Sequence, residues 1–309
     1  MNFKKRITER GKGQGSPRMK AGAFFAALFL ALLLAAPAQA ATLRDQSGSM
    51  VLLPDKPKRI VSLAPNITEL LFALGGGKAV AGCCRHSDYP PETRSLPRVG
   101  SYYRPDLERI VALRPDLCLA VRDGVPATIL ERLEQLGIPV FTLDPQSLEA
   151  LREALLLLGT ILDQREAAEK LAKGMDERLA RVDAVVAAHI RRRAHRPVVL
   201  VRVQASPFMA AARGAYPAQL LERAGGRAFP QGSVLYPRLS PEDLLALRPD
   251  LIIAPGDGPL LPESLPGGRS AIPVHGVPED LLFRPSLRSL DALDRLVPLL
   301  WPREVQEAP

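Results

Sequence analysis

Two stretches of the sequence follow one pattern and are separated by more than a hundred residues. Residues 106–117 and 240–251 each place a Glu, Glu108 or Glu242, seven residues before a Pro, and both contain Ala-Leu-Arg-Pro-Asp-Leu. The offset between the two Glu residues is 134 positions, far beyond the roughly 20–50 residues of a solenoid repeat. The repeat predicts two lobes built on one plan.

Short apolar runs alternate with helical periodicity on both sides of the chain's middle. Asn66-Ile67-Thr68-Glu69 has the pattern of a capping box and opens a helix that Gly75 to Gly77 would end, and residues 217–224 predict another helix. Alternation of this kind is typical of parallel βαβ units. The candidate strands cover residues 59–63, 79–83, 117–121, 140–143, 198–201 and 251–254.

A long helical stretch separates the two alternating regions. Apolar residues keep helical spacing over 148–162, Asp163 stands where an N-cap is expected, and the pattern then continues over 164–193, a length of about 45 Å. We therefore predict an α/β fold of two lobes, each with a parallel sheet flanked by helices, joined by a long rigid backbone helix. The predicted boundaries are 41–147, 148–195 and 196–309.

The first forty residues are predicted to be a cleaved signal peptide that directs the chain to the periplasm. A basic stretch precedes an apolar run over 21–36 and a small-residue cleavage site that ends at Ala40. This segment carries seven Lys or Arg and one Glu, so six of the eight formal positive charges lie in it. The remaining chain has little excess positive charge, which argues against nucleic acid as a partner.

The chain contains three cysteines, Cys83, Cys84 and Cys118. Two interpretations stay open: small buried side chains with free thiols, or one disulfide with one thiol left over. Their spacing, with His86 and Asp88 nearby, fits no closed zinc pattern, so we predict no metal site.

The acid in each copy of the repeat has two explanations. An acidic residue in the first turn stabilises a helix N-terminus, where Ser240 is also a suitable cap. Alternatively, Glu108 and Glu242 occupy matched positions on two lobes and present a paired negative charge to a two-fold partner.

Four segments together resemble the periplasmic vitamin B12- and ferric siderophore-binding protein family of ABC importers. They are Ser62–Leu70 (SLAPNITEL), Ser87–Pro91 (SDYPP), Val99–Tyr102 (VGSY) and Leu107–Leu117 (LERIVALRPDL). The resemblance implies a carrier that holds cobalamin or a related corrinoid between its lobes. It also implies that Glu108 and Glu242 dock on arginines of a dimeric inner-membrane permease, which works with ATPase subunits. We expect a monomer that carries its ligand as cargo and has no cofactor of its own.

Ligand contacts are implied only by local alignment with the vitamin B12 carrier. Aromatic positions of that carrier fall on His86, Tyr102, Val121 and Tyr236, so two of the four keep a ring, one becomes His and one becomes aliphatic. Polar contacts fall on Asp280 and Arg284, and a loop position falls on Phe208. Flat rings with a few polar groups suit a large ligand that must be bound and later released.

Other ligands of the same family remain alternatives. Tyr102 or Tyr103 could ligate a haem iron. Alternatively, Tyr102, Tyr103 and Tyr236 could be ordinary surface or packing tyrosines. Arg122, Arg213 and Arg284 could pair with the carboxylates or phosphate of a ligand, or they could be solvated. A ferric siderophore carrier is the remaining member of this group.

An exported hydrolase is the alternative from another functional class. The sequence has no G-x-S-x-G elbow and no H-E-x-x-H motif, and it contains four histidines. The few histidines also disfavour a zinc or manganese carrier. We therefore predict that the protein is not an enzyme.

Overall fold

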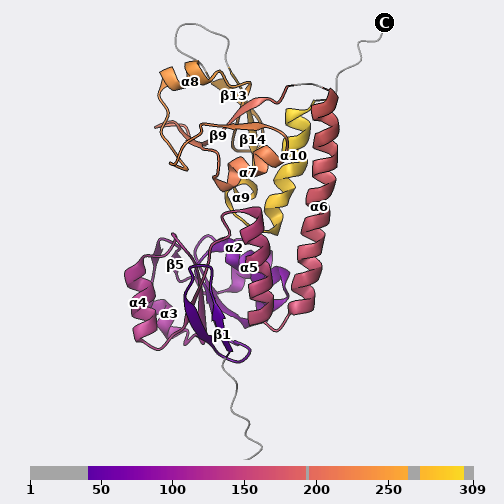
Figure 1. Ribbon diagram of the computed structural model, residues 1–309. Coiled ribbons are helices and arrows are strands. Elements are labelled where there is room, and N and C mark those ends of the chain that lie inside the picture. The colour runs from indigo at the N-terminus through magenta and orange to yellow at the C-terminus, as the bar shows by residue number, and fades with distance from the viewer. Residues whose placement is uncertain (1–40, 193–194, 264–271, 303–309) are drawn as a thin grey trace, which may run out of the picture. The chain divides into compact units, whose positions relative to one another are not determined.

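The computed structural model describes residues 41–192, 195–263 and 272–302. The described residues form one compact unit, and the predicted signal peptide lies outside them. Figure 1 shows the helices and strands and labels a part of them.

The N-terminal lobe is built on a four-stranded parallel sheet in the order β4-β3-β7-β8. Apolar side chains cover both of its faces, as expected for parallel strands buried between helices. A hairpin of β1 and β2 and a small pair of β5 and β6 complete the lobe. The strands are β1 Ala41–Arg44, β2 Met50–Leu53, β3 Ile60–Ser62, β4 Val80–Cys83, β5 Gly100–Ser101, β6 Arg104–Pro105, β7 Leu117–Val121 and β8 Val140–Leu143, and the helices are α2 Pro65–Ala73, α3 Leu107–Ala112, α4 Ala127–Gln135 and α5 Leu148–Ile161.

The C-terminal lobe contains a second sheet in the order β10-β9-β12-β14-β13, with β11 paired to β9. Its centre is parallel, but β10 and β13 are antiparallel to their neighbours, so the sheet is mixed at its edges. The four residues between β9 and β10 are too few for a parallel crossover. The strands are β9 Val198–Gln204, β10 Met209–Ala211, β11 Arg227–Phe229, β12 Leu251–Pro255, β13 Gly258–Glu263 and β14 Ile272–Val277, and the helices are α7 Tyr216–Arg223, α8 Pro241–Leu247, α9 Glu279–Phe283 and α10 Asp291–Leu300.

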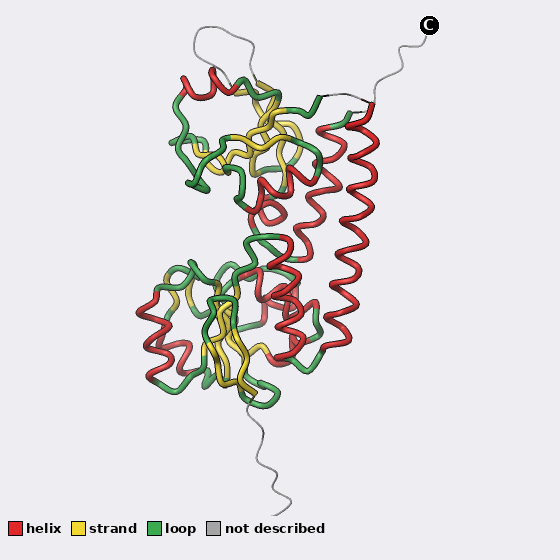
Figure 2. The backbone as a smooth tube through the Cα atoms, viewed as in Figure 1, coloured by secondary structure: helices red, strands yellow, loops and turns green. Residues whose placement is uncertain are grey.

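The predicted backbone helix is α6, which runs for 28 residues from Arg165 to Arg192. Figure 2 shows it as one uninterrupted helix beside helices of both lobes. Arg178 in its middle pairs with Asp291 and Asp294 of α10. One hydrophobic cluster continues from the first sheet through α5 and α6 to the second sheet, so the two lobes share packed side chains.

Two helix starts differ from the prediction. Asp163 has φ 55° and follows the end of α5, where its amide donates to the carbonyl of Thr160. It therefore belongs to the turn that ends α5, and Gln164 accepts the first amide bond of α6 from Ala168. Helix α2 has no side-chain cap and begins with Pro65 after Ala64, because Pro fits the first helical position, where no amide donor is needed.

The repeat is confirmed as a structural unit in both lobes. Arg114 and Arg248 both take positive φ, 46° and 45°, at the same place in the pattern. The Asp two residues later, directly before β7 or β12, bonds to the start of the neighbouring strand. Asp116 accepts from the amide of Arg59 before β3, and Asp250 accepts from the amide of Val198 in β9. Each copy thus ends a helix and anchors the next strand to its neighbour.

All three cysteines are buried free thiols. Burial alone raises the pKa of Cys118 to about 12. Cys83 receives a guanidinium N–H of Arg98 at 2.9 Å from its Sγ, and Cys84 contacts Ser87. The structure therefore matches the first of the two interpretations of the cysteines.

Candidate functional site

The carboxyl edge of the first sheet carries most of the predicted ligand contacts of the N-terminal lobe. His86 follows β4, Tyr102 and Tyr103 form the turn between β5 and β6, and Val121 ends β7. Parallel strands direct the loops after their carboxyl ends to the same edge, where open α/β sheets bind ligands. The sheet topology therefore brings these loops together.

His86, Tyr102 and Tyr103, here called the aromatic group, lie side by side. The ring centroids of His86 and Tyr102 are 6.3 Å apart, and those of Tyr102 and Tyr103 are 5.1 Å apart, both edge-on. The two tyrosines are 39% and 53% exposed. Gly124 lies against Val121 and Tyr102, since a Cβ at this position would be 3.3 Å from the Tyr102 ring. The aromatic group thus presents rings to solvent beside the end of β7.

The arginines that the sequence proposes as anion contacts have partners of their own. Arg122 pairs with Asp144 at 3.2 Å, and Arg213 pairs with Glu222 at 3.1 Å. Both guanidinium groups are more than half exposed, where ion pairs contribute little and exchange readily. A ligand anion could therefore compete for either.

The C-terminal lobe presents a second exposed apolar segment, Val234-Leu235-Tyr236, in the loop before α8. These side chains are 61%, 44% and 37% exposed. Phe208, also predicted as a contact, is half-buried and packs against the core of the second sheet. Within the described residues, no ring contact joins Tyr236 to the aromatic group.

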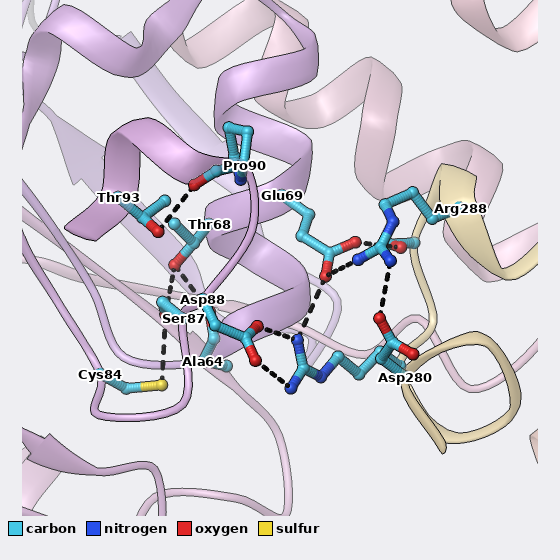
Figure 3. A network of polar contacts seen from close by, with 12 residues as sticks. Ala64, Thr68, Glu69, Cys84, Ser87, Asp88, Pro90, Thr93, Asp280 and Arg288 are labelled. Atoms are coloured by element: carbon cyan, nitrogen blue, oxygen red, sulfur yellow. Dashed lines mark hydrogen bonds and ion pairs between the residues drawn. The ribbon is translucent and has the colours of Figure 1, made fainter. Parts of the chain in front are cut away.

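A network of charged groups connects the two lobes (Figure 3). The carboxylate of Glu69 in α2 has a side chain only 4% exposed. Its Oε2 accepts from Ser286 Oγ at 2.6 Å. Its Oε1 accepts from Arg288 at 3.3 Å and from Arg284 at 3.5 Å.

The two arginines of this network each reach a second acid. Arg284 donates to both oxygens of Asp88, at 2.5 and 3.3 Å. Arg288 donates to Asp280 at 2.6 Å, and its guanidinium carbon lies 3.8 Å from the ring centroid of Tyr89. Asp88 lies two residues after His86, so the network and the aromatic group share one loop.

The environment shifts the pKa of both acids that face Arg284. Burial raises the pKa of Glu69, and its bonds to Ser286, Arg288 and Arg284 oppose that shift. The hydrogen bond from Arg284 lowers the pKa of the exposed Asp88. A depression of about 350 Å³, lined by Glu69, Tyr89 and Arg288 among others, lies next to this network.

Glu108 and Glu242 lie in the first turns of α3 and α8 and are exposed. Capping is performed by other side chains: Asp106 accepts from the amide of Arg109, and Ser240 and Asp243 form a complete capping box. Within the described residues, neither Glu side chain makes a hydrogen bond or an ion pair. The helices therefore have their caps without these two carboxylates.

Four residues of the interlobe network were not predicted as site residues: Glu69, Asp88, Ser286 and Arg288. Glu69 was assigned to a capping box that the structure does not contain. Its partners are 215 to 219 positions away, so no local pattern identifies them. Asp280 and Arg284, predicted as ligand contacts, are both in this network.

The described residues contain no cluster of three or more His, Cys, Asp or Glu arranged to hold a metal ion. Among the same residues, no helix combines the length and apolar character needed to cross a bilayer.

Two α/β lobes joined through a long helix, with exposed aromatic loops at a sheet edge, define a solute-binding protein with a helical backbone. The chain belongs to the periplasmic binding protein family, whose model matches residues 60–292. Members of this family bind substrates for transport.

The vitamin B12-binding protein of Pectobacterium carotovorum is 31% identical over 251 residues, which cover 78% of this chain and 87% of that protein. The crystal structure of the periplasmic vitamin B12-binding protein of Vibrio cholerae matches with a TM-score of 0.68 and 26% identity, over 79% of this chain and 97% of that one. A periplasmic haem-binding protein of Pseudomonas aeruginosa matches with a TM-score of 0.66 and 27% identity, over 80% of this chain and 94% of that one. The protein is thus homologous to vitamin B12-binding and haem-binding proteins.

Proposed function

We propose that this protein binds cobalamin or a related corrinoid between its two lobes and delivers it to an ABC importer. The observation that carries the proposal is the aromatic group, whose tyrosine rings are exposed beside the carboxyl edge of the first sheet. The similarity of the chain to vitamin B12-binding proteins over most of its length supports the corrinoid as the ligand.

The arrangement of side chains suits reversible capture of a large ligand. Tyr102 and Tyr103 in one lobe and Tyr236 in the other offer rings for apolar contact, which gives affinity without a covalent bond. His86 adds an exposed imidazole at the edge of this surface. Asp280 and Arg284 are placed for polar contacts, although each is paired with another residue in this structure. Phe208 contributes through packing of the second lobe.

Delivery would use the matched acids of the repeat. Glu108 and Glu242 are exposed, do not cap their helices and are located at equivalent positions of the two lobes. A permease dimer that presents arginines could bind both, with charge-assisted bonds to each carboxylate. The permease and its ATPase subunits are therefore the proposed partners of a monomeric carrier that catalyses no reaction.

Export and domain organisation are part of the same proposal. Cleavage after residue 40 would release the chain into the periplasm, where vitamin B12 carriers of this family act. The lobe boundaries 41–147 and 196–309, with connecting helices over 148–195, remain our assignment.

The test is calorimetric titration of the chain from residue 41 with cyanocobalamin, haemin and a ferric siderophore. Calorimetry is preferable to intrinsic fluorescence, because the only tryptophan, Trp301, is buried at the end of α10 and stacked on His189. We expect one-to-one binding of cyanocobalamin that is tighter than that of the other two. Absence of binding to all three, or chemical conversion of a bound ligand, would refute the carrier.

Haem is the second candidate, favoured by one specific observation. Tyr102 and Tyr103 are adjacent and exposed, with His86 beside them, and these residue types ligate haem iron. Haem would be favoured over the corrinoid if the wild type binds haemin with a shifted Soret band and binds no cyanocobalamin. Loss of the shifted band in a Tyr102→Phe/Tyr103→Phe variant would then assign the iron ligand to these tyrosines.

A further inference from the structure

The most buried carboxylate of the interlobe network belongs to one lobe, and all its partners belong to the other. Glu69 lies in α2, whereas Ser286 and the two arginines follow α9. Ser286 is fully buried. The contact therefore joins the lobes at a protected point away from bulk water.

The geometry leaves the carboxylate of Glu69 a single orientation. One oxygen accepts from Ser286 and the other from both arginines. Asp88 then holds the outer end of Arg284, and Asp280 holds the outer end of Arg288. Because Glu69, Arg284 and Arg288 each have at least two partners, none of the three can rotate without losing a charge-assisted bond.

A network of this kind is better suited to fixing geometry than to adding stability. Removing charges from water costs free energy that their mutual attraction only partly restores, so buried ion pairs contribute little net stability. Their bonds are directional and do constrain the position of the groups that they connect. The segment from Arg284 to Arg288 is held in this way against α2 and against the loop that contains Asp88.

The position of the network gives this constraint a consequence for binding. Asp88 lies in the same loop as His86, and Arg284 is a predicted ligand contact of the other lobe. A second interlobe hydrogen bond, from Gln219 Nε2 to the carbonyl of Gln146 at 2.9 Å, is exposed and uncharged. The apolar cluster through α5 and α6 joins the lobes, and the charged network ties the loop of the aromatic group to the segment after α9.

We propose that Glu69 is the positioning residue of an interlobe latch, formed with Arg284, Ser286 and Arg288, that sets the separation of the ligand-binding loops before a ligand arrives. A site organised in advance binds more tightly, because no free energy is spent on ordering the lobes during association. Glu69 acts through the arginines and does not itself touch the ligand. The effect on affinity rests on the proposed corrinoid function, whereas the effect on lobe separation does not.

The test uses Glu69→Gln, which keeps the shape of the side chain and removes its charge. The matched control is Asp176→Asn, which removes the ion pair with Arg152 between α5 and α6 and leaves the latch intact. Spin labels attached through Glu131→Cys in α4 and Arg227→Cys in β11 report the distance between the lobes by pulsed electron paramagnetic resonance. The three native thiols are buried, so the introduced cysteines are the ones that react.

In the ligand-free protein, we expect Glu69→Gln to broaden the interlobe distance distribution and the control to leave it unchanged. The dissociation constant for cyanocobalamin should rise about tenfold in Glu69→Gln, the effect of losing one charged hydrogen bond. Saturating cyanocobalamin should narrow the distribution again, which a general loss of stability would not produce.

An unchanged distance distribution in folded Glu69→Gln overturns the latch. A broadened distribution with unchanged affinity overturns its role in positioning. If Glu69→Gln does not fold, Ser286→Ala, which removes one neutral donor, replaces it with the same expected direction and the same criteria. If the wild type binds no cyanocobalamin, the proposed function fails, while the distances still decide the latch.

Discussion

The contribution of Tyr102 to ligand binding can be estimated from its exposure. The side chain is 39% exposed, and a tyrosine that becomes fully buried covers about 200 Å². A ligand could therefore cover about 80 Å² of this ring, which at about 25 cal/mol per Å² corresponds to about 2 kcal/mol. We expect Tyr102→Ala to raise the dissociation constant for cyanocobalamin roughly thirtyfold.

Two variants separate ring contact from other effects. Tyr102→Phe keeps the ring and removes only the hydroxyl, so its affinity should stay within about threefold of the wild type if apolar contact dominates. Met50→Ala removes a side chain that is 63% exposed in β2, outside the predicted contacts, and should have no effect.

The assay is calorimetric titration of each variant, accompanied by thermal unfolding. Because Tyr102 is partly exposed and packs edge-on against two neighbours, its removal should lower the unfolding temperature only slightly. A correctly folded Tyr102→Ala variant whose affinity lies within threefold of the wild type would refute the placement of the ligand on the aromatic group.

Three further outcomes are expected. Reversing both charges, with Glu108→Arg and Glu242→Arg, should abolish stimulation of the transporter ATPase and leave the affinity for ligand unchanged. Gly100→Ala should weaken binding at least tenfold, because Gly100 has φ 92° and a Cβ there would lie 2.5 Å from the carbonyl oxygen of Arg104, so the turn that carries both tyrosines must shift. Asp88→Asn should lower stability by about 0.5 kcal/mol at neutral pH, since this acid is exposed. Because its folded pKa is below its usual value, the Asp88 contribution is present above about pH 4 and is lost as pH falls through the folded pKa.

Each of these outcomes has a control or a contrary result. Glu131→Arg reverses the charge of an exposed Glu outside the repeat, in α4, and should leave ATPase stimulation intact. Stimulation that survives the double reversal would exclude docking through the repeat. Unchanged affinity in Gly100→Ala would show that the turn does not position the tyrosines for binding. For Asp88, thermal unfolding of wild type and variant between pH 7 and pH 3 should converge at the acid end; a difference that persists there would contradict the ion pair as its cause.

Elements defined by local sequence were predictable. The apolar runs became strands of both sheets, and the period of 164–193 became α6, because hydrophobic spacing and end signals act within a few residues. The repeat also had a local basis, since its caps at Asp106 and Ser240 bind amides three residues away. The incorrect start of α2 has a local reason as well: Asn66 and Glu69 have the spacing of a capping box, yet Pro65 begins the helix earlier.

The edges of the second sheet and the partners of the buried charges were not predictable in this way. β13 pairs antiparallel with β14 although nothing in its own residues specifies direction. The packing of Phe208, half-buried against the second core, also was not evident from its own segment. Such outcomes depend on which surfaces meet after the chain has folded.

The sequence by itself determined the α/β class, the long helix, the internal repeat and the family to which the chain belongs, because each rests on spacing that is fixed by covalent connectivity. The tertiary structure alone decided that Glu69 meets Ser286 and two arginines more than two hundred residues later. A carboxylate that is exposed on a helix surface is hydrated and needs no protein partner. A carboxylate that is buried between two lobes needs hydrogen-bond donors, because an unpaired buried charge costs free energy. The contact between the lobes therefore could not be identified before the lobes were placed together.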